Sequence, residues 1–238
     1  MKKLVVLFVC TLLTVVNLAR SADFASVTVE GGYNNSYVVN GVELAKEVPY
    51  AGVAAIKSLK YADVYVGGLL IANKDVDQSH WLIGAGKTLS VWDSKNVALR
   101  ADANVLRHQT SSIGIENSTE FGVKLALQNP LITPYVRGSF NLELEQKGYF
   151  FGAERAQKLP FGFVLTPAVE WGRVTDYDTI HAKAELTRPF TFAWGAVTPF
   201  AGIGWYDNPE WNSASTTKFA LRRFQSDTVY NAGLKFSF

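Results

Sequence analysis

Apolar and polar residues alternate along most of this 238-residue chain, in stretches of about ten residues. Between Phe121 and Leu127 every second residue is Phe, Val or Leu. The same period recurs in 97–105, 136–142 and 180–186. Successive side chains of a strand point to opposite faces of its sheet, so this period predicts antiparallel strands with one apolar and one polar face. Beyond residue 22, no apolar run is long enough to span a membrane as a helix.

Turn-forming residues separate the alternating stretches and set the number of strands. Gly, Asn, Asp and Pro favour turns for defined dihedral reasons. We predict short turns at 58–60, 93–96, 128–132, 158–162 and 189–194. The strands between them are predicted at about 24–35, 47–57, 61–72, 79–92, 97–107, 117–127, 133–144, 148–157, 163–173, 179–188, 195–206 and 227–238, which makes about twelve. The segment from Val42 to Val48 fits either a strand or a loop, so ten strands remain an alternative.

Residues 1–21 have the layout of a secretory signal peptide. A basic start precedes an apolar stretch from Leu4 to Val16, and small residues follow near Ser21. The apolar stretch is shorter than the roughly 20 residues of a membrane-spanning helix, which argues against an anchor. We therefore expect cleavage after Ser21, with a cut after Ala22 as the close alternative, and one mature domain over 22–238.

Composition narrows the function classes. The chain is 48% hydrophobic and 13% aromatic, which excludes a disordered chain. Cleavage would remove the only cysteine, Cys10, so no disulfide framework is available. It would also leave 20 basic against 21 acidic residues, which excludes the strongly basic surface typical of nucleic-acid binding.

The last predicted strand carries the most specific pattern in the chain. Five apolar or aromatic residues share one face of it, and the last of them ends the chain: Tyr230, Ala232, Leu234, Phe236 and Phe238. This strand resembles the C-terminal strand of Gram-negative outer-membrane β-barrels. The resemblance implies that Tyr230, Leu234, Phe236 and Phe238 form a recognition signal for the barrel-insertion machinery. It also implies that the C-terminus is periplasmic and that the segment 207–226 is an external loop.

These patterns together favour a membrane barrel over a soluble sandwich, which would also show period-two alternation. Inside a bilayer every backbone N–H and C=O must be paired within the protein, so a sheet must close on itself. Closure turns one face to lipid and the other to the lumen. We expect an all-β, antiparallel transmembrane barrel with short periplasmic turns and longer external loops. Aromatic residues near the predicted strand ends fit the girdles of such barrels: Trp81, Trp92, Tyr149, Phe151, Trp171, Trp205 and Tyr230.

Charged residues at the positions opposite the apolar face are the candidate lumen lining. The main candidates are Arg100, Asp102, Lys124, Arg137, Glu143, Glu154, Glu170, His181, Lys183, Glu185 and Lys235, with Glu30 and Asp63 sharing the parity. Such charges can line a water-filled pore and set its ion preference. They can also pair across the lumen and plug it. A barrel of twelve strands lies between the filled eight-stranded barrels and the wide porins, which favours a narrow channel.

An enzyme is not expected. The three histidines are His80, His108 and His181, and no nucleophile, zinc-ligand or dinucleotide motif accompanies them. The segment His108-Gln109-Thr110-Ser111 departs from the His-x-Ser motif of lipid A deacylases, because Thr110 stands where the serine belongs. His181 follows Asp176 and Asp178, which most simply describes a polar strand residue after an acidic loop. We expect neither a cofactor nor a metal.

The sequence therefore predicts an outer-membrane channel for passive passage of ions or small polar solutes. The alternative is a structural or adhesive barrel with a plugged lumen. Expected partners are outer-membrane lipids and lipopolysaccharide, whose phosphates suit the guanidinium groups of Arg222 and Arg223.

Overall fold

The computed structural model describes residues 26–39, 42–72, 77–90, 96–110, 117–175, 177–207 and 226–238. Nearly all of these lie in strands: β1 (Ser26–Val39), β2 (Val42–Ser58), β3 (Asp63–Ala72), β4 (Asp77–Ser90), β5 (Ala98–Thr110), β6 (Ser118–Gln128), β7 (Thr133–Asn141), β8 (Gln146–Glu154), β9 (Gln157–Lys158), β10 (Val164–Val174), β11 (Tyr177–Thr187), β12 (Phe190–Phe192), β13 (Gly195–Asp207) and β14 (Ser226–Ser237). A 3₁₀ turn, η1, spans Pro160–Gly162. The described part of the chain contains no helix that is both long and apolar enough to cross a membrane. The expected signal peptide at 1–21, with Cys10, lies outside the described residues, as do Trp92, Asp176, Arg222 and Arg223.

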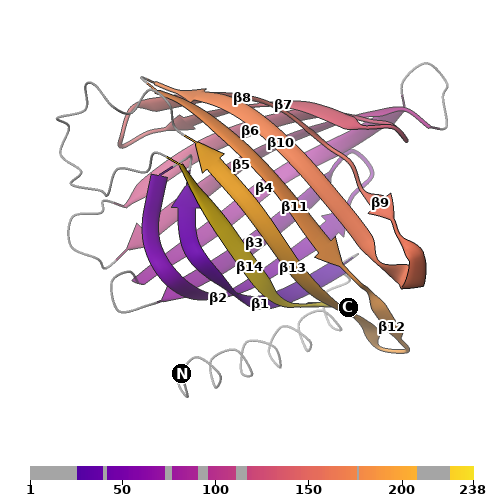
Figure 1. The fold of residues 1–238 in the computed structure, drawn as a ribbon. Helices are drawn as coiled ribbons and strands as arrows, with labels where there is room; N and C mark the ends of the chain where they lie inside the picture. Colours follow the sequence, from indigo (N-terminus) through magenta and orange to yellow (C-terminus); the bar gives the residue numbers. More distant parts are fainter. Residues whose placement is uncertain are drawn as a thin grey trace.

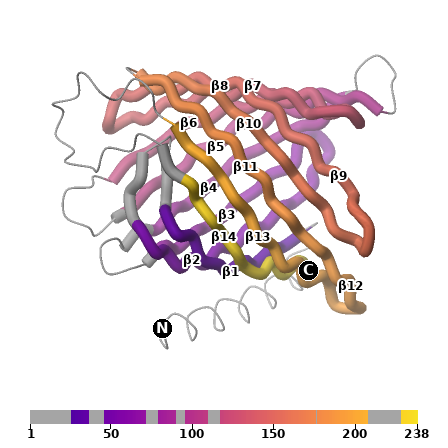
Figure 2. The backbone as a smooth tube through the Cα atoms, viewed as in Figure 1, coloured from indigo at the N-terminus to yellow at the C-terminus, as the bar shows by residue number. Residues whose placement is uncertain are grey.

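The sheet closes on itself, with its strands running antiparallel (Figure 1; Figure 2). Closure is made by β1 and β14, which pair from Thr28 opposite Ser237 to Asn34 opposite Asn231. Beyond this ladder, the Phe238 N–H donates to the Val27 carbonyl at 2.9 Å. The chain is thus a closed antiparallel β-barrel, as the alternation predicted. Among the described strands, the short strands β9 and β12 have one partner each, β10 and β13, and every other strand is paired on both sides.

The barrel has twelve strands, because two of them are each divided by proline. β8 and β9 both pair with β10, and the gap between them lies opposite Pro167. β11 and β12 both pair with β13, with Pro189 in the gap and Pro199 opposite it. Proline has no backbone N–H to donate, so it interrupts a ladder without ending the strand. The predicted turn at 189–194 is therefore shorter than expected, because β12 extends the hairpin.

The first hairpin is longer than predicted. β1 extends to Val39 and β2 begins at Val42, and the two pair along their length with a register shift at Tyr37 and Val38. The expected break at 36–46 was therefore wrong, and the alternative of a strand from Val42 was right. The ten-strand alternative is excluded.

The outer wall of the barrel is apolar and exposed. Strand residues such as Ile83, Val123 and Phe151 are each more than half exposed. A continuous apolar surface of this kind is typical of contact with lipid and not with water. Exposed aromatic residues on this wall include Trp81, Tyr149, Phe151, Trp171, Trp205 and Tyr230, and Phe151 stacks on Trp171 with ring centroids 5.9 Å apart.

Both ends of the described chain lie at one end of the barrel, here named the C-terminal end (Figure 1). The turns at 59–62, 129–132, 159–163 and 193–194 lie at this same end. The strands β1, β3, β5, β7, β10 and β13 run away from this end and finish at the other end of the barrel, named the opposite end.

Candidate pore site

Charged residues form a row along the inner face of neighbouring strands. Asp102 on β5 lies in register with Lys124 on β6, which lies in register with Arg137 on β7. On the same strands the alternate positions, such as Val123 and Val136, are exposed apolar residues of the outer wall. Because side chains alternate between the two faces of a strand, the row lies on the lumen face.

A second set of contacts joins this row to β3. Arg100 and Asp102 are two residues apart on β5, and the Arg100 Nη2 donates to Asp102 Oδ1 at 2.8 Å. The Arg100 Nη1 lies 3.4 Å from Asp63 Oδ2. The ion pair lies over Gly86 of β4, where an added Cβ would come within 2.0 Å of the Asp102 carboxylate. Glycine is therefore required at this position for the carboxylate to approach the neighbouring strand.

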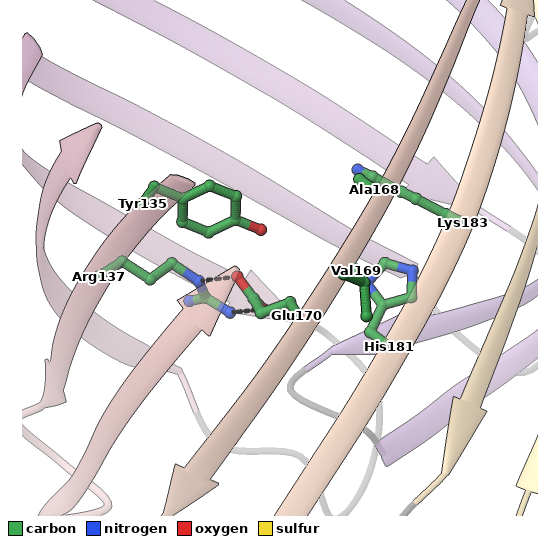
Figure 3. Close-up of a pocket in the computed structure, with 7 residues that line it drawn as sticks. All are labelled: Tyr135, Arg137, Ala168, Val169, Glu170, His181 and Lys183. Carbon is green, nitrogen blue, oxygen red and sulfur yellow. Dashed lines mark hydrogen bonds and ion pairs between the residues drawn. The ribbon is translucent and has the colours of Figure 1, made fainter. Parts of the chain in front are cut away.

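Arg137 and Glu170 form a two-pronged ion pair farther around the lumen wall (Figure 3). The Arg137 Nε donates to Glu170 Oε2 at 2.9 Å, and the Arg137 Nη2 donates to Oε1 at 2.8 Å. The guanidinium carbon also lies 3.4 Å from the centroid of the Phe150 ring, and Phe150 is 1% exposed. Parallel hydrogen bonds and the ring beneath fix the guanidinium in one plane.

A pocket of about 250 Å³ opens beside this ion pair. It is lined by Tyr135, Arg137, Ala168, Val169, Glu170, His181 and Lys183 (Figure 3). The His181 ring stacks on Tyr206 of β13, with centroids 3.9 Å apart and planes 12° apart. Lys183 is exposed, and within the described ranges it forms no ion pair. The pocket therefore combines one paired cation, one exposed cation, an imidazole and a phenol.

The other expected lumen residues occupy separate places around the wall. The Lys124 Nζ lies 4.1 Å from the centroid of the Tyr135 ring. The Lys235 Nζ lies 3.7 Å from Glu30 Oε2 across β14 and β1. Glu154 and Glu185 share the inner parity, since they lie opposite Ala168 and Thr166 of β10.

Glu143 is not part of this lining. β7 ends at Asn141, so Glu143 lies in the turn before β8. Its Oε1 accepts a hydrogen bond from the Arg107 Nη1 at 2.7 Å, and its Oε2 accepts one from the Thr119 backbone N–H at 2.6 Å. Arg107 pairs in register with Trp81, an exposed residue of the outer wall. The expectation of an inward Glu143 fails because the strand ends two residues before it, and parity does not extend through a turn.

The lumen face nearer the opposite end is more enclosed and less charged. On β2 and β3, Val48 and Ile71 are buried, with Tyr50 and Leu69 packed against them. On β8, β10 and β11, the buried residues are Val174 and Tyr177, together with Phe150, which lies in register with Arg137 of the charged row. The buried polar residues on described strands here are Ser36, His80, Ser118, Asn141 and Thr179. The charged row therefore lies closer to the C-terminal end than Val48 and Ile71, and Phe150 packs against it.

The three histidines lie at two separate places on the described strands. The His80 Nδ1 and His108 Nδ1 lie 2.7 Å apart on β4 and β5. Asp178 contacts Arg173 at 3.7 Å on the outer wall, whereas His181 lies in the lumen pocket. Among the residues that the structure describes, no three His, Cys, Asp or Glu side chains are grouped to hold a metal ion.

Aromatic residues in the lumen were missed at the sequence level. Tyr135, Phe150 and Tyr206 all contact or line the pocket region, and Tyr135 and Phe150 have the parity of Arg137 and Glu154. Parity alone would have placed them inside. Aromatic residues occur on both faces of these strands, so residue type by itself does not indicate the lumen.

Comparison with known proteins identifies the fold. No protein-family model and no curated protein matches the chain. Among solved structures, the NanC porin matches with a TM-score of 0.55 and 10% identity, over 88% of this chain and 98% of that one. The KdgM porin in complex with disordered oligogalacturonate matches with a TM-score of 0.54 and 9% identity, over 90% of this chain and 99% of that one. At such low identity the likeness concerns the fold alone, and it shows that this chain folds as these porins do.

Proposed function

We propose that the protein is an outer-membrane channel for passive passage of ions or small polar solutes. The observation that carries the proposal is the lumen pocket, in which Lys183 is exposed and unpaired within the described ranges, beside the Arg137–Glu170 ion pair. A lumen filled only for stability is expected to bury or pair its charges, because an unpaired charge in a closed interior is costly. An exposed cation in a barrel lumen fits a water-filled path.

The charges along the path predict weak ion selectivity. Arg100 is bound by two carboxylates, Arg137 by one, and Lys235 lies beside Glu30. Lys124 and Lys183 supply further positive charge, and Glu154 and Glu185 supply further negative charge on the same face. Rings of one sign set strong selectivity in channels, and this lining has charges of both signs.

The proposed location follows from the sequence and the barrel together. The signal peptide at 1–21 is proposed to direct export, and Tyr230, Leu234, Phe236 and Phe238 on β14 are proposed to be recognised by the insertion machinery. Tyr230 and Leu234 are exposed on the outer wall, where another protein can reach them during assembly. The C-terminal end of the barrel is then periplasmic, and lipopolysaccharide is a proposed partner of the opposite end through Arg222 and Arg223.

Single-channel conductance of the refolded protein in planar bilayers tests the proposal. We expect reproducible conductance steps, and we expect Lys183→Glu to shift the reversal potential in a salt gradient toward cations. Lys147→Glu is the matched control, because it makes the same charge change at an exposed residue of the outer wall beside Tyr149. The absence of steps at every salt concentration would contradict the channel, and unchanged selectivity in Lys183→Glu would remove Lys183 from the path.

A structural barrel with a closed lumen is the second candidate. It is favoured by the enclosed groups on the lumen face, where Val48, Ile71 and Phe150 are at most 1% exposed. The same recordings separate the candidates, since a closed lumen gives no steps in the wild type.

A further inference from the structure

The short turns at the C-terminal end of the barrel have unusually apolar tips. Each of the four described turns there exposes a large apolar side chain: Tyr61 is 77% exposed, Leu131 71%, Phe161 84% and Trp194 49%. Turn tips at a water-facing surface are commonly polar, because loops lie in solvent. We name these four residues the turn-tip collar.

The backbone around Phe161 adds a second observation. Phe161 has a φ of 61°, in the left-handed region that non-glycine residues seldom adopt. Such a conformation is costly for a bulky residue, and a residue that is 84% exposed gains little from packing within the barrel. Packing inside this chain therefore does not explain why a phenylalanine is presented at this tip.

Basic residues accompany the collar, and acidic ones do not. The Lys60 Nζ lies 5.1 Å from the centroid of the Tyr61 ring, and Lys158 is exposed just before η1. The Arg188 guanidinium lies 4.9 Å from the ring centroid of Phe190 on β12. The segments that carry the collar contain no Asp or Glu: 59–62, 129–132, 155–163 and 188–194.

We propose that the turn-tip collar inserts into the lipid headgroup layer and that Lys60, Lys158 and Arg188 bind the phosphates of anionic phospholipid. The collar continues the exposed apolar wall of the barrel, which already faces lipid, so the same bilayer covers both surfaces. Aromatic side chains favour the membrane interface, and Lys and Arg beside an anionic leaflet are each worth about 1 kcal/mol. The excess of basic over acidic residues matches an anionic headgroup and not a neutral one.

This contact would set the depth of the barrel in the membrane. The four tips belong to turns that are spread around the barrel, the first between β2 and β3 and the last between β12 and β13. Anchoring all four would hold the C-terminal end of the barrel level with the headgroups. The arrangement does not depend on whether the lumen conducts, because every residue involved lies in a turn or on a strand end outside the pocket.

Quenching of Trp194 fluorescence by brominated lipids tests the proposal. The protein is refolded in phosphatidylcholine vesicles that contain brominated phosphatidylglycerol or brominated phosphatidylcholine. The contribution of Trp194 is the difference between the wild type and Trp194→Phe, since the chain has six tryptophans. We expect strong quenching by both lipids and, at low salt, about a fivefold or greater preference for phosphatidylglycerol, since each basic residue contributes about 1 kcal/mol. The preference should fall at high salt, because salt screens exposed charges.

The triple variant Lys60→Gln, Lys158→Gln, Arg188→Gln should bring the two lipids to equal quenching. Lys147→Gln, at the opposite end, is the control and should keep the wild-type preference. Circular dichroism and heat-dependent electrophoretic mobility report whether each variant is folded. Where the triple variant does not fold, Arg188→Gln alone and the salt dependence of the wild type serve the same purpose. An unquenched Trp194 would place the tips in water or against a protein and overturn the proposal. Equal quenching by both lipids in the wild type, or an unchanged preference in the variants, would also overturn it.

Discussion

The Arg137–Glu170 pair gives a prediction whose size follows from its geometry. Two charged hydrogen bonds of 2.9 and 2.8 Å join the side chains. The Arg137 side chain is 29% exposed and the Glu170 side chain 14% exposed. Hydrogen bonds to charged groups are worth about 1.5–3 kcal/mol net, and surface ion pairs about 0.2–1 kcal/mol. Because this pair is sheltered but not fully buried, we expect a coupling energy of about 1–3 kcal/mol.

A double-mutant cycle measures this coupling. The variants are Arg137→Met, Glu170→Gln and the double variant, and the measured quantity is the free energy of unfolding from urea titrations of the barrel in lipid vesicles. Glu170→Gln should be destabilising, because it leaves the guanidinium against the Phe150 ring with one acceptor fewer. The cycle is needed because each single variant also changes the solvation of the residue that remains.

The Arg173–Asp178 pair is the matched control for this cycle. Its charged atoms are 3.7 Å apart and the Arg173 side chain is 54% exposed on the outer wall. We expect a coupling below about 0.5 kcal/mol there, as for other exposed pairs. If the lumen pair coupled no more strongly than the outer pair, the argument that shelter and two-pronged geometry strengthen it would be wrong.

Two further predictions concern packing and pH. An added Cβ at Gly172 would lie 2.1 Å from the Phe150 ring. Gly172→Ala should therefore lower the free energy of unfolding, measured by the same urea titration, by about 1–3 kcal/mol, as overpacking does. Gly138→Ala is the control and should be near neutral, because no atom lies nearer than 3.8 Å to the added Cβ. Equal effects would mean that the ring moves freely. In the turn outside the strands, the Thr119 backbone N–H lowers the pKa of Glu143. A lowered pKa in the folded state stabilises the protein at neutral pH and loses that contribution as the pH falls through and below about 4.3, the ordinary Glu value. The stability difference between the wild type and Glu143→Gln should therefore shrink in acid, and a difference independent of pH would contradict this.

The alternating pattern shows which features of the fold could be predicted from the sequence. Alternation around Val123 and Lys124 determined which side chains face lipid and which face the lumen, because a strand has only two faces and a bilayer tolerates only a closed sheet. Most predicted strand positions hold for the same reason. Prediction failed where parity stops, at Glu143 in a turn, and where one residue type has two roles, as for the lumen ring of Phe150.

Tertiary structure decided the contacts that give the lumen its chemistry. Glu170 meets Arg137 from a strand two places away in the sheet, and His181 stacks on Tyr206 of another strand. Both pairings depend on register, and the Arg137–Glu170 pair depends also on side-chain reach across the intervening strand β8. The alternating pattern predicts neither the register nor the side-chain reach. Shifting a strand by two residues leaves the same side chains facing lipid and lumen but changes every neighbour on the adjacent strands. The sequence by itself determined a barrel with a charged interior, and only the folded register decided which charges are paired and that Lys183 stays exposed beside the pocket.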